Sequence, residues 1–246
     1  MTIAHNIETI RRNLPASVKL MAVSKQVPVA LMREAYAVGI RDFGESRIQE
    51  AQAKQQELTD VRDLCWHLIG HLQGNKVRKA VQIFDWIHSI DSLKLLQQVD
   101  RVCAELDKKL YVCLQVKILP DPDKYGWTIP DLLADLPQIC ECQHLDIAGL
   151  MVIPPLGLTP AQTQALFESA RDLSIQIRQQ SGSRLDLPEL SMGMSGDYRS
   201  AITAGSTIIR LGSILFGDRT SEMGVRSEKC VLGVSPSEAP FQDSKE

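Results

Sequence analysis

The stretch VKLMAVSKQVP (residues 18–28) decides the fold. Its first seven residues form a short apolar run that predicts a buried strand, and Pro28 suits the first position of a helix. A doubly wound open sheet, the structural alternative, normally carries a glycine-rich turn after its first strand. The turn here contains no glycine, which favours a parallel barrel. Lys25 ends the run, where burying its ammonium would cost several kcal/mol unless it is paired or neutralised.

Seven further apolar runs follow, and segments with helical spacing or capping signals separate them. The eight predicted strands span residues 18–24, 40–44, 65–70, 85–90, 110–118, 145–153, 187–193 and 206–212. Strands that alternate with helices indicate a parallel α/β protein. Eight such units within residues 1–217 fit a (β/α)8 TIM barrel, and the amphipathic start of the chain predicts an extra N-terminal helix.

Local signals mark the ends of several predicted helices. Gly39 is a natural stop for the helix that begins after Pro28. Thr128 and Thr159 each stand before a proline-initiated helix, where a threonine hydroxyl is a good N-cap. Asp91 or Ser92 is predicted to cap the helix between the fourth and fifth strands.

The composition is that of an ordinary globular protein, with 44% apolar and 23% charged residues. The net charge of −3 points to neither nucleic acid nor an anionic membrane as a partner. No apolar run reaches the roughly 18 residues of a membrane span, and the first residues lack a signal-peptide core. We therefore expect a cytoplasmic protein, in which residues 218–246 form a C-terminal helix and mobile tail.

The cysteines and histidines show no metal-binding pattern. The spacing fits neither a zinc site nor a disulfide framework, so we expect reduced thiols at positions 65, 103, 113, 140, 142 and 230. His67 and His71 would suit a metal site on one helix face, but the stretch between them is predicted as strand and loop. We expect no metal, and structural or substrate-facing histidines.

Two strand-end stretches predict a phosphate site. SMGMSGD (191–197) follows the seventh predicted strand, and RLGS (210–213) ends the eighth. In many parallel barrels the loops after these two strands hold phosphate through backbone N–H groups and hydroxyls. The alternative is that both stretches are only tight turns.

A phosphate site opposite a strand-end lysine fits either pyridoxal phosphate (PLP) or a sugar phosphate in a Schiff-base aldolase. Arg210 favours PLP, because a guanidinium facing the pyridine nitrogen only donates hydrogen bonds and keeps that nitrogen unprotonated. A structural ion pair is the alternative role for Arg210. Lys117 is a rival lysine, but Lys25 shares a strand face with Met21 and Val23, a drier setting that favours a free amine.

Seven stretches occur in an order that is specific in combination: AVSK (22–25), FGESRIQE (43–50), WHLIGHLQGNK (66–76), KYG (124–126), GLM (149–151), LSMGMSGD (190–197) and STIIRLGSILFG (206–217). Together they resemble the pyridoxal phosphate homeostasis family over about residues 1–217. The resemblance implies a fold-type III PLP-binding barrel, similar to the N-terminal domain of alanine racemase.

The resemblance also implies a set of cofactor-binding residues: Lys25, Ser46, His67, Met194, Ser195, Arg210, Gly212 and Ser213. Lys25 would form the Schiff base. Ser195 and the backbone groups of Gly212 and Ser213 would hold the phosphate, and Arg210 would face the pyridine nitrogen. The remaining three would line the pocket.

Two positions depart from the family pattern. Ser46 and Lys117 stand where many members have asparagine. Either change could alter the polarity of the pocket, but neither touches the lysine or phosphate motifs. The departures therefore leave the expected cofactor unchanged.

The expected role is to hold PLP rather than to turn it over. Racemases of this fold use a second acid/base group and a second β-domain, for which about 30 residues after the last strand are too few. We predict a monomeric, non-enzymatic protein of PLP homeostasis and amino-acid/keto-acid balance. Its partners would be PLP and amino acids or apo-enzymes that receive it. An amino-acid racemase and a Schiff-base aldolase are the alternatives.

Overall fold

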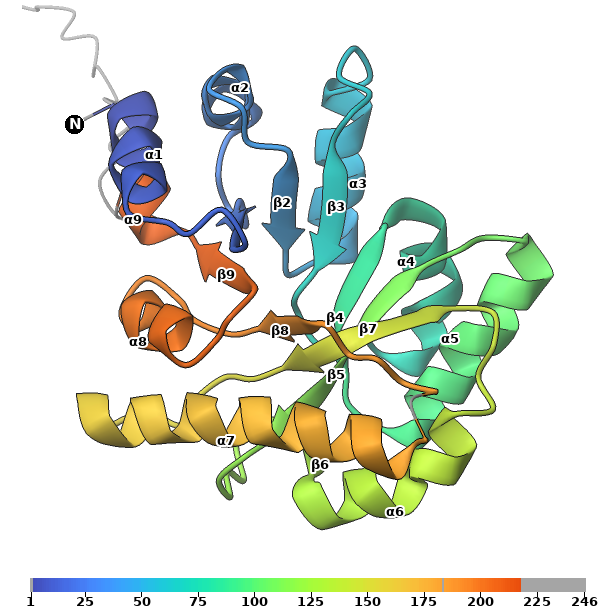
Figure 1. Ribbon diagram of the computed structural model, residues 1–246. Coiled ribbons are helices and arrows are strands. Elements are labelled where there is room, and N and C mark those ends of the chain that lie inside the picture. The colour runs from blue at the N-terminus through green and yellow to red at the C-terminus, as the bar shows by residue number, and fades with distance from the viewer. Residues whose placement is uncertain (1, 183, 218–246) are drawn as a thin grey trace, which may run out of the picture.

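The computed structural model describes residues 2–182 and 184–217. In this part of the chain, eight parallel strands close into a barrel in the order β1-β2-β3-β4-β5-β7-β8-β9, with β9 paired back to β1 (Figure 1). They are β1 (Lys19–Val23), β2 (Asp42–Glu45), β3 (Cys65–Leu68), β4 (Trp86–Ile90), β5 (Tyr111–Lys117), β7 (Asp146–Met151), β8 (Glu189–Ser191) and β9 (Ile208–Leu211). The predicted barrel and its eight strands are confirmed. The sequence did not predict β6 (Trp127–Thr128), a two-residue strand paired with β5.

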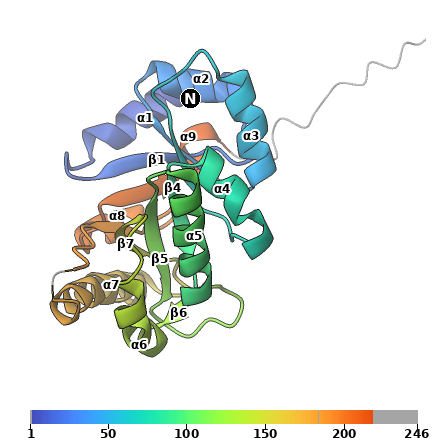
Figure 2. The same cartoon turned by 90° about the vertical axis from the view of Figure 1, so that its right-hand side faces the viewer.

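Helices surround the strands, as Figures 1 and 2 show. They are α1 (Ile3–Arg12), α2 (Val29–Ala37), α3 (Ile48–Glu57), the 3-10 turn η1 (Gly74–Lys76), α4 (Val77–Ile83), α5 (Leu93–Leu106), α6 (Ile129–Ile139), α7 (Pro160–Gln180), α8 (Tyr198–Thr203) and α9 (Ser213–Phe216). The predicted extra N-terminal helix is α1. Asn6 Nδ2 donates to the Leu215 carbonyl at 3.0 Å and thereby ties α1 to α9, the helix that follows the last barrel strand.

Most of the capping predictions hold. The Thr128 hydroxyl accepts the Asp131 N–H at the start of α6, and Thr159 forms a full capping box at the start of α7. Gly39 follows α2 with a φ of 90°, which glycine adopts without strain. Ser92 occupies the cap position of α5, but its side chain makes no capping hydrogen bond, and its hydroxyl donates to Asp91 Oδ1 at 3.1 Å.

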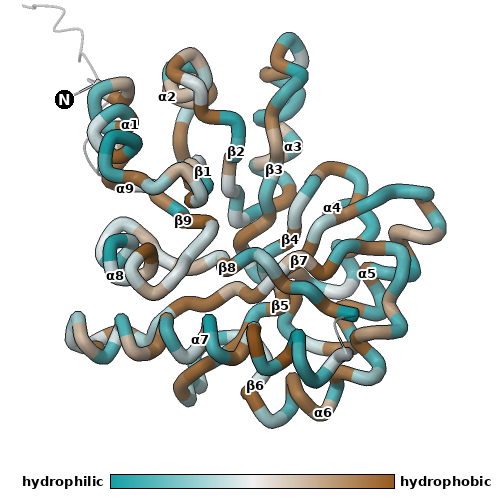
Figure 3. The backbone as a smooth tube through the Cα atoms, in the orientation of Figure 1, coloured by the Kyte–Doolittle hydropathy of each residue, from teal (hydrophilic) through white to brown (hydrophobic). Residues whose placement is uncertain are grey.

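Apolar side chains are buried on both faces of the barrel wall. Most of them lie between the strands and the surrounding helices, and Figure 3 shows hydrophobic residues along the strands. A separate small cluster takes one residue from each of five strands: Met21, Trp86, Cys113, Met151 and Ile208. Since side chains alternate between the two faces of a strand, this cluster fills the barrel interior. Residues that lie an even number of positions from these five along the same strands therefore also point into the barrel.

Some sequence predictions fall outside the described residues. Residues 218–246 carry the predicted C-terminal helix and Cys230, so that helix and the domain division at residue 217 stay predictions. Five cysteines of the described part, at positions 65, 103, 113, 140 and 142, have free thiols, as predicted. Among the described helices, none combines the length and apolar character needed to cross a membrane.

Candidate functional site

Lys25 lies in the turn directly after β1, in a pocket of about 230 Å³ at the C-terminal ends of the strands. The pocket is lined by Val23, Lys25, Ile69, Met194, Ser195, Gly196, Arg210, Gly212 and Ser213. Residues from the ends of four strands therefore meet at one place. Six of the eight residues that the sequence predicted, all except Ser46 and His67, are brought together. Sequence reasoning missed Val23, Ile69 and Gly196, although Val23 shares the inward parity of Lys25.

His67 is not among the residues that line this pocket, so its predicted place beside the cofactor stays a prediction. Its side chain is fully buried inside the barrel, with Nε2 3.0 Å from Asp42 Oδ1 and Nδ1 2.9 Å from His88 Nε2. Burial lowers the pKa of His67, and Asp42 partly opposes this. Ile69 lies two residues after His67, so both side chains point into the barrel. Ile69 lies nearer the C-terminal end of the strand and lines the pocket, whereas His67 lies one layer deeper.

Ser46 also lies outside the pocket lining. It is half-buried, and its backbone carbonyl lies 2.2 Å from where a Cβ on Gly70 would stand. Glycine is therefore required at position 70, because the backbone after β3 passes directly over the backbone after β2. Ser46 takes part in this crossing through its backbone.

The two histidines considered as metal ligands are separated. His71 Nδ1 lies 3.0 Å from Asp91 Oδ2, and its ring stacks on Tyr125 at 3.6 Å between centroids. In the barrel interior, Asp42, Cys65 and His67 have potential ligand atoms within 4.8 Å of one another. The direct hydrogen bond between His67 and Asp42 explains why these two are close, so the proximity needs no ion.

Lys117 lies apart from Lys25. It ends β5, its Nζ lies 3.4 Å from the Asp121 carbonyl, and it lines a neighbouring pocket with Pro120 and Pro122. Both lysines are half-buried, so the predicted difference in dryness does not separate them. The two lysines differ in their neighbours, because only the pocket of Lys25 is also lined by Ser195 and Arg210.

A buried ion pair holds the residue that precedes Lys25. Lys54 Nζ, from α3, donates to the Ser24 carbonyl at 2.7 Å and to Glu45 Oε1 at 2.8 Å. The Ser24 hydroxyl donates to the same Glu45 oxygen at 2.7 Å. Burial raises the pKa of Glu45, and the hydrogen bonds from Lys54 and Ser24 oppose that rise. No sequence pattern indicates this cluster, because its members lie on separate elements.

The residue after Lys25 is held by the same group of charges. Gln26 has a φ of 60°, which is uncommon for a residue other than glycine, and its N–H donates to Glu50 Oε1. Lys54 donates to the same Glu50 oxygen at 2.7 Å. Burial raises the pKa of Glu50, but the bonds from Lys54 and Gln26 outweigh it and lower that pKa overall. The turn that carries Lys25 is therefore fixed on both sides.

The loop after β8 is folded tightly against α8. Gly193 has a φ of 96°, and a Cβ there would lie 2.6 Å from the Ala201 Cβ. The Met194 N–H donates to Asp197 Oδ1 at 2.6 Å, and the Asp197 N–H donates back to the Met194 carbonyl at 3.1 Å. This reciprocal turn presents Ser195 at the pocket. A Cβ on Gly196 would meet nothing within 4 Å, so the space beside Ser195 is open.

Arg210 is 4% exposed and is bound by neutral groups. Its guanidinium donates to the Ser191 carbonyl, to Ser191 Oγ at 3.0 Å and to the Val152 carbonyl at 3.0 Å. Burial lowers the pKa of Arg210 to about 10, and the charge of Asp197 partly opposes this. Within the described residues Arg210 forms no ion pair, so the structural ion-pair alternative is not supported.

Comparison with known proteins identifies the family. Residues 1–220 match the family model described as alanine racemase, N-terminal domain. The chain is 52% identical over 206 residues to the pyridoxal phosphate homeostasis protein of Synechocystis sp., which covers 84% of this chain and 94% of that protein. This chain belongs to the pyridoxal phosphate homeostasis protein family. It is also 40% identical over 228 residues to the homeostasis protein of Pseudomonas aeruginosa, covering 89% of this chain and 96% of that one.

Solved structures of other proteins have the same fold. PipY of Synechococcus elongatus without PLP is 56% identical, with a TM-score of 0.86, over 88% of this chain and all (100%) of that one. PipY with PLP bound is 55% identical, with a TM-score of 0.85 and the same coverage, 88% and 100%. An alanine racemase of Clostridium difficile is 14% identical, with a TM-score of 0.70 over 90% of this chain and 60% of that one, and so shares the fold.

Proposed function

We propose that this member of the homeostasis family binds pyridoxal 5'-phosphate as a Schiff base on Lys25. We propose further that it acts in PLP homeostasis and amino-acid/keto-acid balance without robust catalytic activity. The observation that carries the proposal is the single pocket that joins Lys25 to Ser195, Arg210, Gly212 and Ser213. The relatives' name and the PLP-bound PipY structure support the choice of ligand.

The residues of the pocket fit the phosphate of this cofactor. Ser195 offers a hydroxyl beside the open space at Gly196. Gly212 is the N-cap of α9 and Ser213 is its first residue, and the first N–H groups of a helix have no acceptor within it. Hydroxyl and backbone N–H donors in one concavity are the usual ligands of a phosphate dianion.

Lys25 and Arg210 fit the two ends of the pyridine ring system. When bound, PLP supplies an electrophilic aldehyde carbon and an electron-withdrawing ring. Lys25 is a half-buried amine on a fixed turn, which can reach the aldehyde and remain open to an incoming amine. Arg210 only donates hydrogen bonds, so opposite the ring nitrogen it accepts no proton from it and leaves it unprotonated. A ring kept in that state withdraws electrons weakly, which supports holding over turnover.

The proposed partners follow from this role. The recipients of PLP would be free amino acids and apo-enzymes, which carry amines able to displace Lys25. We propose that the protein acts in the cytoplasm, where PLP-dependent enzymes need the cofactor. We also propose that it is a monomer.

Two measurements on the PLP-loaded protein test the proposal. The visible absorption spectrum is expected to show a bound-PLP band that shifts when a free amine is added. Proton NMR in heavy water is expected to show no exchange of the α-proton of L- or D-alanine. Sustained exchange would overturn the non-catalytic role in favour of a racemase. The absence of any bound-PLP band would overturn the cofactor assignment.

A further inference from the structure

A continuous series of hydrogen bonds crosses the barrel interior and takes one residue from each of five strands. Arg210 Nη1 lies 3.0 Å from Ser191 Oγ, which lies 2.8 Å from His88 Nδ1. His88 Nε2 lies 2.9 Å from His67 Nδ1, and His67 Nε2 lies 3.0 Å from Asp42 Oδ1. We call this series the relay. It joins the pocket of Lys25 to the opposite, N-terminal end of the barrel.

The chemistry of its two ends gives the relay a direction. A guanidinium only donates, so Ser191 Oγ accepts from Arg210 and has its own proton available for His88 Nδ1. An accepting Nδ1 leaves the proton of a neutral His88 on Nε2, which then donates to His67 Nδ1. By the same reasoning His67 carries its proton on Nε2 and donates it to the Asp42 carboxylate. Every donor in the relay thus has one acceptor.

The surroundings keep both imidazoles neutral. His67 and His88 have no solvent exposure, and burial lowers the pKa of each. The charged groups that act on them are Lys19, Asp42 and Asp85 at one end and Arg210 at the other. For His88 the cations Arg210 and Lys19 lower the pKa further, whereas for His67 the carboxylate of Asp42 opposes the effect of burial.

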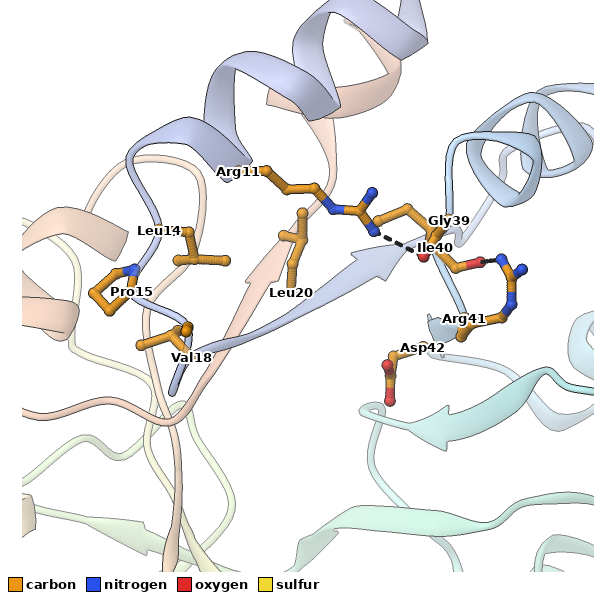
Figure 4. Close-up of a pocket in the computed structure, with 10 residues that line it drawn as sticks. Arg11, Leu14, Pro15, Val18, Leu20, Gly39, Ile40, Arg41 and Asp42 are labelled. Carbon is orange, nitrogen blue, oxygen red and sulfur yellow. Dashed lines mark hydrogen bonds between the residues drawn. The ribbon is translucent and has the colours of Figure 1, made fainter.

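Asp42 differs from the rest of the relay in its exposure. It begins β2, and its side chain is 21% exposed. It lines an open pocket with Arg11 and Arg41 at the N-terminal end of the barrel (Figure 4). The relay therefore ends on a carboxylate that solvent can reach, on the side of the barrel away from Lys25.

We propose that Asp42 is a positioning residue for the cofactor site. It acts through His67 and His88 on the Ser191 hydroxyl, which accepts a hydrogen bond from the Arg210 guanidinium. By accepting the last proton, the carboxylate holds the His67 proton on Nε2 and so, together with Arg210 at the other end, sets the tautomer of both histidines. It thereby keeps His88 Nδ1 as the acceptor of the Ser191 proton, while the Oγ lone pairs accept from Arg210. The effect on PLP rests on the proposed function, whereas the direction of the relay does not.

Nitrogen-15 NMR of the histidine rings in the full chain without PLP tests the direction. The signals are assigned with His67→Gln and His88→Gln. We expect both rings to be neutral with the proton on Nε2. A His67 cation, or a proton on Nδ1 of His88, would overturn the proposal. These signals come from the native chain, so they decide the direction whether or not an Asp42 variant folds.

Substitutions of Asp42 test its action at a distance. Asp42→Leu leaves the buried His67 Nε2–H without its acceptor, so part of the population should carry the His67 and His88 protons on Nδ1, although His88 makes no hydrogen bond to Asp42. Asp42→Asn keeps an acceptor oxygen and should retain the native tautomers. Asp85→Asn removes a nearby charge that accepts the Trp66 N–H at 2.8 Å, and should also leave them unchanged. An unchanged His88 in Asp42→Leu would overturn the proposal.

The loaded protein separates this inference from the proposed function. With PLP bound, Asp42→Leu is expected to shift the visible absorption band, whereas Asp42→Asn is not. Reversed tautomers with an unshifted band would overturn the action of the relay on the cofactor. The absence of a bound-PLP band in the native chain would instead overturn the proposed function, while the NMR result would stand.

Discussion

The Nζ atom of Lys54 lies 2.8 Å from Glu45 Oε1, and both side chains are buried beside the turn that carries Lys25. The other carboxylate oxygen, Glu45 Oε2, is buried and has no hydrogen-bond partner among the described residues. A buried charge without its partner is strongly destabilising, so this cluster depends on the lysine.

Replacement of Lys54 should therefore destabilise the fold and loosen the Lys25 turn. Lys54→Met is expected to lower the free energy of unfolding by about 3–5 kcal/mol, because Glu45 and Glu50 lose their common cation. Urea denaturation measures this. Arg12→Met is the control, since it breaks an exposed pair with Glu8 that contributes at most about 1 kcal/mol. Equal losses in the two variants would contradict the role of the cluster.

The buried histidines predict a dependence of stability on pH. Burial holds the pKa of His67 and His88 below 6.5, so below that pH the unfolded chain binds more protons than the folded one. The contribution of the two histidines to the free energy of unfolding should be fully present above pH 6.5. As the pH falls below 6.5, the free energy of unfolding should decrease by up to about 1.4 kcal/mol per pH unit for each histidine. Glu45, whose pKa is raised from 4.5, acts in the opposite direction, because its contribution is lost as pH rises.

A comparison of the native chain with His88→Gln isolates the effect of one histidine, because Glu45 is present in both. The stability of His88→Gln should fall less steeply below pH 6.5 than that of the native chain, by about 1.4 kcal/mol per pH unit. Urea denaturation at a series of pH values gives both slopes. Identical slopes would mean that His88 is not held neutral by the fold.

A side chain at position 193 should destabilise the tight loop after β8. Gly193→Ala places a Cβ against Ala201 on a backbone of positive φ, and should cost about 1–3 kcal/mol. Gly157→Ala is the matched control, because Gly157 also has a positive φ, of 84°, but its Cβ would meet nothing within 4 Å. Thermal unfolding compares the two, and a larger loss for Gly157→Ala would contradict the packing of α8 described above.

The Ser195 hydroxyl should strengthen PLP binding without stabilising the fold. Loss of one hydrogen bond to a charged group costs about 1.5–3 kcal/mol, so Ser195→Ala should weaken PLP binding by roughly 10- to 100-fold. Ser169→Ala on the exposed face of α7, where the hydroxyl donates to the Ala165 carbonyl, is the control. Equilibrium titration with PLP measures both variants, and equal affinities would exclude Ser195 from the phosphate site.

The alternation of strands and helices, and the residues at strand ends, could be predicted from the sequence. The apolar run before Lys25 became β1, and the stretches at 191–197 and 210–213 reached one pocket, because parallel strands end on the same side of a barrel. The depth of His67 could not be predicted, because one step of two residues along a strand separates a residue that lines the pocket from one that is buried below it.

Charged clusters formed across elements could not be predicted. Lys54 meets Glu45 only because α3 folds back over β2, and the partners in the relay are up to 103 positions apart in the sequence. Neither contact leaves a local pattern, since periodicity reports burial of apolar residues and not the pairing of distant polar ones.

The central claim is that Lys25 is the covalent anchor of PLP. Borohydride reduction of the PLP-loaded protein followed by peptide mass spectrometry tests it most directly, since reduction fixes the cofactor to the amine that holds it. The account predicts a PLP adduct on the peptide containing Lys25, and no such adduct in Lys25→Ala. An adduct on Lys117 in the native chain, or undiminished labelling of Lys25→Ala, would contradict it.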